Sequence, residues 1–201
     1  MNQIGTQSVN EFLADLSAKQ PTPGGGAVAG LLAALSTSLG QMVLAYTDGK
    51  KKYTQHKQLH DDCVSFLRAA SEEAIVLANE DAEAYEKMNA LWKLEIDDPI
   101  RTESWDTALQ NAIAVPMKTM ELSHRILVTI QTLIGKTNAL LVSDIVIAAI
   151  LAEAAARSAR LNVEINLKQL ENTQERSSLE NKTTTLLSEC LALCKTIEDG
   201  C

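Results

Sequence analysis

Aromatic residues are scarce in this 201-residue chain, where they make up 3% of the sequence. Pleated sheets are enriched in aromatic and β-branched side chains, so a composition dominated by Ala, Leu, Ser and Thr disfavours a sheet protein. Glycine and proline are absent from residues 54–94, and no repeat or low-complexity tract divides the chain. We therefore expect one all-α domain over residues 1–201, built as a bundle of long antiparallel helices.

Positive charge is also in deficit, because 18 basic residues stand against 26 acidic ones and the net charge is −8. Proteins that neutralise the phosphates of nucleic acids carry the opposite sign, so we expect no nucleic-acid partner. The N-terminus lacks the basic start and apolar run of a secretory signal. The four cysteines have no metal-binding spacing. Both observations predict a cytoplasmic protein with reduced thiols.

Charge is missing altogether from residues 20–47, a stretch long enough to cross a bilayer, which takes about 20 residues. This stretch opens with the turn-forming sequence PTPGGG, and polar residues such as Ser36, Thr37 and Gln41 interrupt the rest. Membrane spans are richer in Leu, Ile and Phe. A buried central helix over 27–47 is therefore the preferred interpretation, and we expect no membrane partner.

Capping and turn signals place the other helices. Ser8 and Glu11 form a capping-box pattern. Pro116 predicts a kink and Gly135 a stop, while Ser143 has the position of an N-cap. With the apolar periodicity, these signals predict helices over residues 9–18, 27–47, 54–94, 102–133, 144–170 and 177–197.

Polar side chains interrupt two of the predicted apolar helix faces. Asp81 falls on the stripe of the helix over 54–94, and Asp144, Asn162 and Asn166 share one face of the helix over 144–170. Buried amides require hydrogen-bond partners, which are either a ligand or the backbone of the glycine-rich loop. Asp144 has a further interpretation, as a carboxylate that favours the helix dipole.

Two other segments could contact an anion. Gly24, Gly25 and Gly26 precede a helix and could present backbone N–H groups, although on their own they favour a tight turn into a packed helix, and no nucleotide-binding fingerprint accompanies them. Three consecutive lysines, which include Lys51 and Lys52, follow the end of that helix. They either stabilise its terminal carbonyls or attract a carboxylate-bearing substrate.

Histidines raise the question of a metal site. His56 and His60 lie one helical turn apart, but no glutamate is placed as in the HExxH pattern of zinc enzymes. Serine and cysteine nucleophile motifs are missing as well. The residues therefore predict a site of carboxylates and amides on helices, with no metal and no cofactor.

Taken together, four segments resemble the cyclodeaminase/cyclohydrolase family, whose domain is fused to formiminotransferase in animals and free-standing in bacteria. They are PTPGGGAVAGLLAAL from Pro21, GKKKY from Gly49, DAEAYEKM from Asp81 and SDIVIAAILAEAAARSARLNVEINL from Ser143. The resemblance spans nearly the whole chain, and the order of the motifs makes it specific. It implies an all-helical homodimer whose substrate is a tetrahydrofolate derivative.

Two reactions occur in this family, and both pass through a tetrahedral carbon between N5 and N10. One closes 5-formiminotetrahydrofolate to the 5,10-methenyl form with loss of ammonia, and the other hydrolyses the methenyl form to 10-formyltetrahydrofolate. The resemblance implies three catalytic residues, which are Asp81, Asp144 and Lys52. It implies six substrate-binding residues, which are Gly24, Gly25, Gly26, Lys51, Asn162 and Asn166.

The chain departs from the family pattern at two places. After Met88 the family continues into a Leu-Pro-Lys-like turn, whereas this chain reads NALWKLEIDDP, and Ala27 replaces a common serine. A loop that lines the site is therefore expected to differ. The alternative functions are a folate-binding or scaffold protein without catalysis and a membrane-inserted helical protein.

Overall fold

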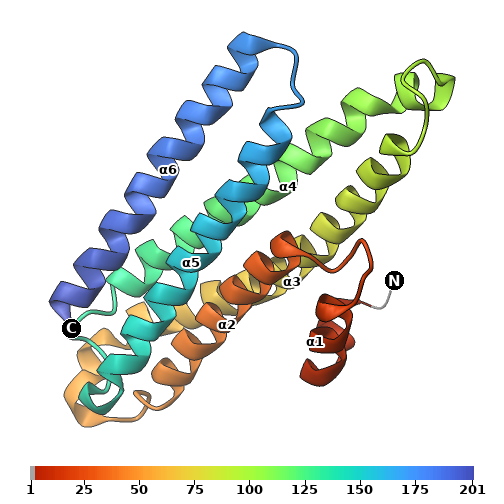
Figure 1. Cartoon of the computed structure of the whole chain (residues 1–201). Helices are drawn as coiled ribbons and strands as arrows, with labels where there is room; N and C mark the ends of the chain where they lie inside the picture. The colour runs from red at the N-terminus through yellow and green to blue at the C-terminus, as the bar shows by residue number, and fades with distance from the viewer. Residues whose placement is uncertain (1–2) are drawn as a thin grey trace.

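The computed structural model describes residues 3–201, and within that range every regular element is helical (Figure 1). The prediction of an all-α fold is therefore confirmed. The elements are η1 (Ile4–Thr6), α1 (Val9–Ser17), α2 (Gly25–Ala45), η2 (Lys51–His56), α3 (Lys57–Trp92), α4 (Pro99–Gln131), η3 (Ala139–Leu141), α5 (Val142–Leu167) and α6 (Thr173–Gly200).

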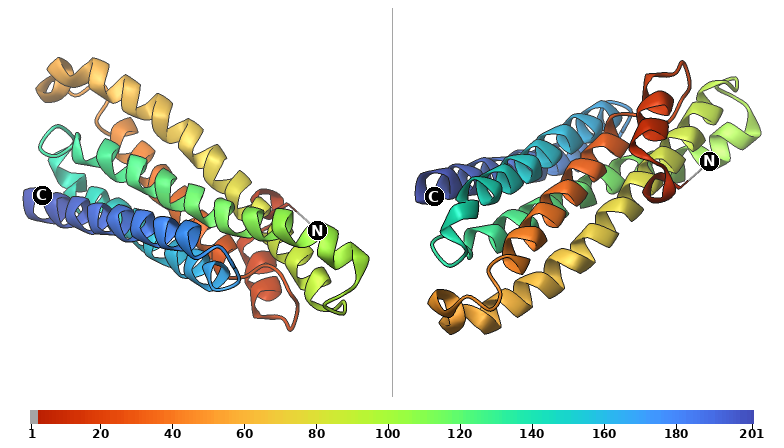
Figure 2. Two further views of the ribbon diagram at one scale, coloured as in Figure 1. Left: turned by 90° about the horizontal axis from the view of Figure 1, so that it is seen from above. Right: turned by 90° about the horizontal axis from the view of Figure 1, so that it is seen from below.

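Helices α2 to α5 form the centre of the bundle, and successive helices run in opposite directions (Figure 1). Helix α2 packs against α3 and α5, while α4 packs against α3 and α5 from the other side. Helix α6 covers α4 and α5. Helix α1 lies at the edge of the bundle (Figure 2), where Phe12 packs with Ala27 and Ala78.

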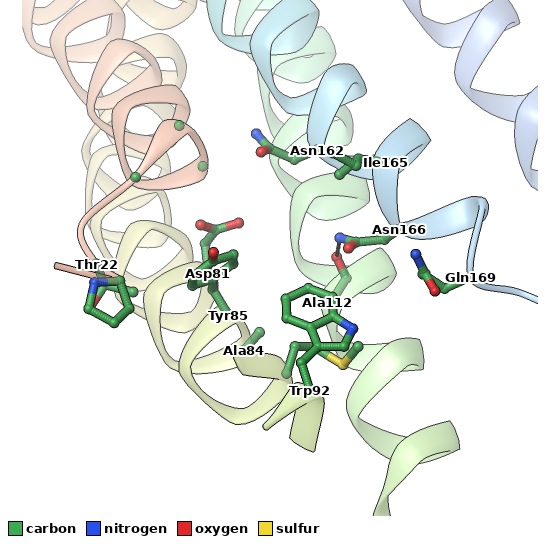
Figure 3. Close-up of a pocket in the computed structure, with 15 residues that line it drawn as sticks. Thr22, Asp81, Ala84, Tyr85, Trp92, Ala112, Asn162, Ile165, Asn166 and Gln169 are labelled. Atoms are coloured by element: carbon green, nitrogen blue, oxygen red, sulfur yellow. Dashed lines mark hydrogen bonds between the residues drawn. The ribbon is translucent and has the colours of Figure 1, made fainter. Parts of the chain in front are cut away.

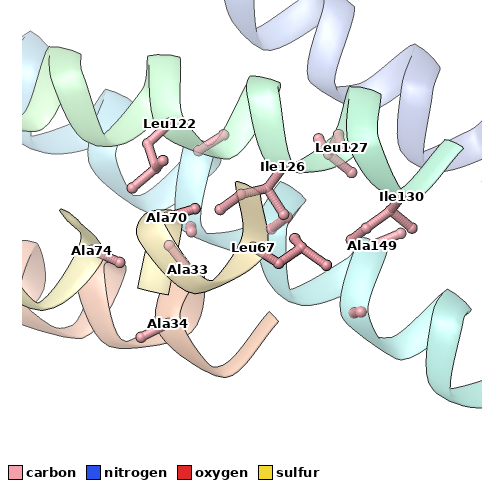
Figure 4. Packing of buried hydrophobic residues seen from close by; sticks show 14 of the residues in the cluster. Ala33, Ala34, Leu67, Ala70, Ala74, Leu122, Ile126, Leu127, Ile130 and Ala149 are labelled. Carbon is pink, nitrogen blue, oxygen red and sulfur yellow. The ribbon is translucent and has the colours of Figure 1, made fainter. Parts of the chain in front are cut away.

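Small side chains let the central helices approach closely. Ala148, Ala152 and Ala155 of α5 are fully buried. Larger side chains such as Leu67 of α3 and Ile126 of α4 fill the space between the helices (Figure 4). Close packing of this kind maximises dispersion contacts between helices. The short distances between the central helices therefore require small side chains such as alanine where the helices meet.

The uncharged segment predicted as a central helix is α2. Its polar residues are satisfied inside the bundle, because the Ser36 hydroxyl donates to the carbonyl of Ala148 at 2.7 Å and the Thr37 hydroxyl donates to that of Ala34 at 2.7 Å. Two segments, Gly25–Ala45 and Ala139–Leu167, are long and apolar enough to span a membrane by length and composition alone. Both supply buried residues to the core of the bundle.

Several helix ends differ from the predicted ones. Ser143 is not an N-cap, because η3 runs directly into α5 and makes Leu141 the capping position. Helix α4 begins at Pro99, three residues early, because the Asp98 carboxylate accepts from the N–H groups of Ile100 and Arg101. The cap of α6 is Asn172, so that helix also starts earlier.

Two further differences concern α3 and α4. Residues 51–56 form η2, and α3 begins only at Lys57. Helix α4 continues through Pro116.

The contact between α2 and α3 predicts different outcomes for two glycine variants. A Cβ atom at Gly30 would lie 2.7 Å from the Cβ of Ala78 and 2.9 Å from the backbone oxygen of Ala74. Gly30→Ala should therefore push the helices apart and lower the free energy of unfolding by roughly 1–3 kcal/mol, measured by urea denaturation. At Gly40 the nearest atom is the flexible end of Leu67 at 3.0 Å. Gly40→Ala is the matched control, and equal destabilisation by both variants would contradict the prediction.

Candidate functional site

A cavity of about 490 Å³ lies between the N-terminus of α2, the C-terminal half of α3 and the C-terminal half of α5 (Figure 3). Its size is within the range of small-molecule sites. The residues around it include one carboxylate and no cation. They are Pro21, Thr22, Gly24, Gly25, Gly26, Asp81, Ala84, Tyr85, Met88, Trp92, Ala112, Asn162, Ile165, Asn166 and Gln169.

Asp81 of α3 occupies the space where Gly26 of α2 would carry a side chain. A Cβ atom at Gly26 would lie 2.0 Å from the carboxyl carbon of Asp81, closer than any real contact. Gly26 therefore allows the carboxyl group to rest against the first turn of α2, whose N–H groups have no partner within the helix. The glycine and the aspartate form one structural unit at the floor of the cavity.

Burial changes the acidity of Asp81. Within residues 3–201 no group donates a hydrogen bond to this carboxyl, and removal from water raises its pKa from 3.8 to about 6. Desolvation disfavours the charged form of a carboxylic acid, which explains the direction. A carboxyl that titrates near neutral pH can both accept and return a proton, as a general acid and base must do.

Two asparagines of α5 face the carboxyl from the other side of the cavity (Figure 3). The amide NH₂ of Asn162 donates to the backbone oxygen of Ser158 at 3.1 Å. That of Asn166 donates to the backbone oxygen of Ala112 at 2.7 Å. These bonds hold the side chains in place and leave the amide oxygens as acceptors for a ligand.

The structure brings together only part of the predicted site. Asp81, the three glycines at 24–26 and both asparagines line the cavity. Asp144 begins α5, 18 residues before Asn162, which is about 27 Å along the helix axis. Lys51 and Lys52 are exposed on η2, beyond the opposite end of α2. Within one chain, these three charged residues therefore do not reach the cavity.

Other lining residues were not among the predicted site residues. Tyr85 is 44% exposed, and it forms an edge-to-face pair with Trp92 at 6.1 Å between ring centroids. Trp92 lies in the segment where the sequence departs from the family pattern. The one sequence signal that could have identified Trp92 as a site residue is its aromatic side chain within this departing segment. Gln169 follows the end of α5 and has no sequence signal.

The zinc alternative gains no support from the geometry. Within residues 3–201, no three His, Cys, Asp or Glu side chains gather as a metal site would require. The Nε2 atom of His60 is 2.9 Å from the backbone oxygen of Lys136, which ties α3 to the loop before η3.

Comparison with known proteins identifies the family. The formiminotransferase-cyclodeaminase profile matches residues 8–185. The chain belongs to this family. A methenyltetrahydrofolate cyclohydrolase of Methylorubrum extorquens is 27% identical over 94% of this chain and 93% of its own length. The formimidoyltransferase-cyclodeaminase of Rattus norvegicus is 29% identical over 90% of this chain, which spans only 34% of that protein.

A solved member of the formiminotransferase-cyclodeaminase family has the same fold. The crystal structure of formiminotetrahydrofolate cyclodeaminase from Thermotoga maritima superimposes with a TM-score of 0.89 and 26% sequence identity. The match covers 98% of this chain and 96% of that one. The resemblance recognised in the sequence is therefore confirmed at the level of both family and fold.

Asp81 should make this family member less stable at neutral pH than at acid pH. Its pKa of about 6 in the folded state exceeds the ordinary aspartic acid value of 3.8, so ionisation destabilises the fold as the pH rises from about 4 to 6. Asp81→Asn should raise the free energy of unfolding by roughly 1–3 kcal/mol at pH 7.5 and leave it nearly unchanged at pH 4. Urea denaturation at both pH values tests this. The exposed Glu83→Gln on the same helix is the control, and a pH-independent gain in Asp81→Asn would refute the assignment.

Proposed function

We propose that the chain acts on the one-carbon bridge between N5 and N10 of tetrahydrofolate, as a methenyltetrahydrofolate cyclohydrolase or a formimidoyltetrahydrofolate cyclodeaminase. The observation that carries this proposal is the partly buried Asp81 carboxyl at the floor of the cavity, opposite two amides that are held by hydrogen bonds. The activities named for the relatives support it, because both act on that bridge. A non-catalytic folate-binding protein is the alternative.

Asp81 is suited to the proton transfers of both reactions. In hydrolysis, water adds to the methenyl carbon and loses a proton; the resulting hydroxyl then gives up its proton as the bond from that carbon to N5 breaks, and N5 receives a proton. In cyclodeamination, N10 adds to the formimino carbon and loses its proton, and the formimino nitrogen takes up two protons in all and leaves as ammonia. One carboxyl with a pKa of about 6 can accept the first proton and deliver the second. Its negative form also stabilises the cationic bridge.

The anionic tail of folate lacks a counter-charge in this cavity. The lining has no Lys or Arg, although the substrate carries glutamate carboxylates. Lys51 and Lys52 are the candidates from the sequence, and they lie about 30 Å away along α2. Asp144 is separated from the asparagines in the same manner, at the opposite end of α5.

We infer that a second copy of the chain completes the site, in a homodimer. Apolar side chains on α2 and α5 are exposed along one side, although those helices are central to the bundle. They are Leu35, Ile147, Ile150, Leu161 and Ile165, each between 42% and 64% exposed. Contiguous exposed apolar surface marks interaction sites. A two-fold axis perpendicular to these helices places the η2 end of one copy against the α2 N-terminus of the other. The partner's lysines and aspartate then approach the cavity.

Turnover is measured first, because it separates an enzyme from a binding protein. The purified protein should consume the chromophore of 5,10-methenyltetrahydrofolate or form it from 5-formiminotetrahydrofolate with release of ammonia. Asp81→Asn should lower kcat by about 100-fold or more because the proton carrier is lost. Gly26→Ala should have a similar effect, because its methyl group displaces the carboxyl. Glu83→Gln is the active control, and folate binding without turnover of either substrate would establish the non-catalytic alternative.

Mixing two inactive variants tests the composite site. Asp81→Asn and the double variant Lys51→Ala, Lys52→Ala damage different halves of the proposed site. In an equilibrated mixture, half of the dimers are mixed and each holds one intact site, so activity should return to about a quarter of wild type. An absence of recovery would show that the lysines do not act across an interface.

The apolar face gives an independent check of the dimer. Leu161→Asp places a charge on the proposed interface and should yield a folded, inactive monomer by light scattering. Leu191→Asp is the matched control on α6, where the side chain is 42% exposed. This control should remain a dimer in buffer without detergent. A wild-type protein that requires detergent would instead support the membrane-inserted alternative.

A further inference from the structure

The C-terminal end of α3 presents two aromatic rings to the cavity. Tyr85 and Trp92 are two turns apart on the same face of the helix and pack edge to face, with 44% and 40% of each residue exposed. In contrast, the other tryptophan, Trp105, packs at the core and stacks under the guanidinium of Arg101 at 4.8 Å. An exposed aromatic pair at the edge of a cavity offers apolar contact area for a flat ring.

The opposite wall offers hydrogen-bond acceptors. One N–H of each amide, on Asn162 and on Asn166, is donated to a backbone carbonyl, so the oxygen and the second N–H of each remain for a ligand. The Asn162 oxygen is 3.7 Å from the position of a Cβ on Gly25, which places it beside the glycine loop. A ligand that fits between the two walls therefore combines a flat ring with hydrogen-bonding groups, N–H donors among them, along one edge.

We propose that Trp92 forms the stacking platform for the pterin ring of the folate substrate and that Tyr85 supports the indole edge to face, with the N–H edge of the pterin directed at the oxygens of Asn162 and Asn166. This assignment rests on the proposed function and adds the direction in which the substrate lies. The 2-amino group, N3–H and N8–H of a tetrahydropterin are the donors that the asparagine wall requires. The benzoyl ring of folate carries no comparable set of donors.

The order of groups along the cavity agrees with the order of groups in the substrate. Trp92 lies eleven residues beyond Asp81 on α3, about 16 Å along the axis, and its side chain leans back toward Asp81. The pterin at the aromatic pair therefore places the N5–N10 bridge near the Asp81 carboxyl. The benzoylglutamate then continues past the α2 N-terminus, where the partner's lysines are proposed to lie.

The helical path of the chain around residue 92 fixes the position of the indole. Trp92 lies within the segment NALWKLEIDDP, where the sequence departs from the family pattern. Because α3 continues as a helix to Trp92, the indole is held on the same face as Tyr85. The sequence predicts that a loop lining the site differs here. In the structure the altered segment begins as the end of α3, and it contributes one aromatic ring, Trp92, to the cavity wall.

Binding of substrate halves tests this assignment directly. Calorimetry measures the affinity of 6-methyltetrahydropterin and, separately, of p-aminobenzoylglutamate. Trp92→Leu should weaken pterin binding by about tenfold, within the range measured for aromatic stacking on bases. Trp92→Phe keeps a flat ring and should stay within about threefold of wild type. Neither variant should change the affinity for p-aminobenzoylglutamate. Ile96→Ala, at an 81% exposed position near the same helix end, is the control.

Kinetics and fluorescence supply two further readouts. Trp92→Leu should raise KM for the whole folate with little change in kcat, because the contact exists in both the ground state and the transition state. In Trp105→Phe, Trp92 is the only tryptophan, so its emission reports pterin binding.

The outcomes distinguish this proposal from the proposed function. Normal turnover by wild type together with unchanged pterin affinity in Trp92→Leu would overturn the stacking assignment alone. Weakened binding of p-aminobenzoylglutamate in place of the pterin would overturn the direction of the substrate. A wild-type protein that neither binds nor converts folate would overturn the proposed function itself.

Discussion

The close approach of α2 and α3 is the constraint on which the rest of the structure depends. Gly30 lets the α2 backbone lie against Ala74 and Ala78, and Gly26 leaves room for the Asp81 carboxyl one turn earlier. A larger side chain at either position would move the helices apart. The same contact fixes where α2 begins relative to the middle of α3, and this offset leaves the C-terminal half of α3 free to form a cavity wall. Helix spacing and cavity geometry therefore share one cause.

The Asp81 carboxyl shows that a functional site can lower the free energy of unfolding of the protein that contains it. Its ionised form lies in a poorly hydrated space where none of residues 3–201 donates a hydrogen bond to it, so its pKa rises to about 6. A well-placed asparagine would avoid this cost, yet it could not carry a proton. Residues that weaken a fold without packing benefit are typical of functional sites. The same conflict between stability and function is visible in the sequence, where the charged Asp81 interrupts an otherwise apolar helix face.

The sequence predicts the helices well and the site only in part, for a geometric reason. Helical periodicity gives the angle of a side chain around the axis, so it correctly placed Asp144, Asn162 and Asn166 on one face. Angle does not give proximity, because Asp144 is about 27 Å from Asn162 along the helix. Contacts between helices, such as that of Gly26 with Asp81, depend on relative offsets that no local pattern records. Trp92 could be noticed as a departure, but its place on the cavity required the fold.

One surface accounts for two features of the sequence that otherwise seem unrelated. The absence of charge from α2 and much of α5 gives both helices the composition of membrane spans, although each is part of a packed bundle. A dimer that buries their outer faces requires the same composition, because charges at the centre of an interface are costly to desolvate. The two-fold axis of the proposed dimer would also bring each copy's lysines toward the other's cavity, whose described lining includes no cation. In this proposal the apolar faces and the exposed lysines are two parts of one interface, in which the first would hold the copies together and the second would supply charge for the substrate.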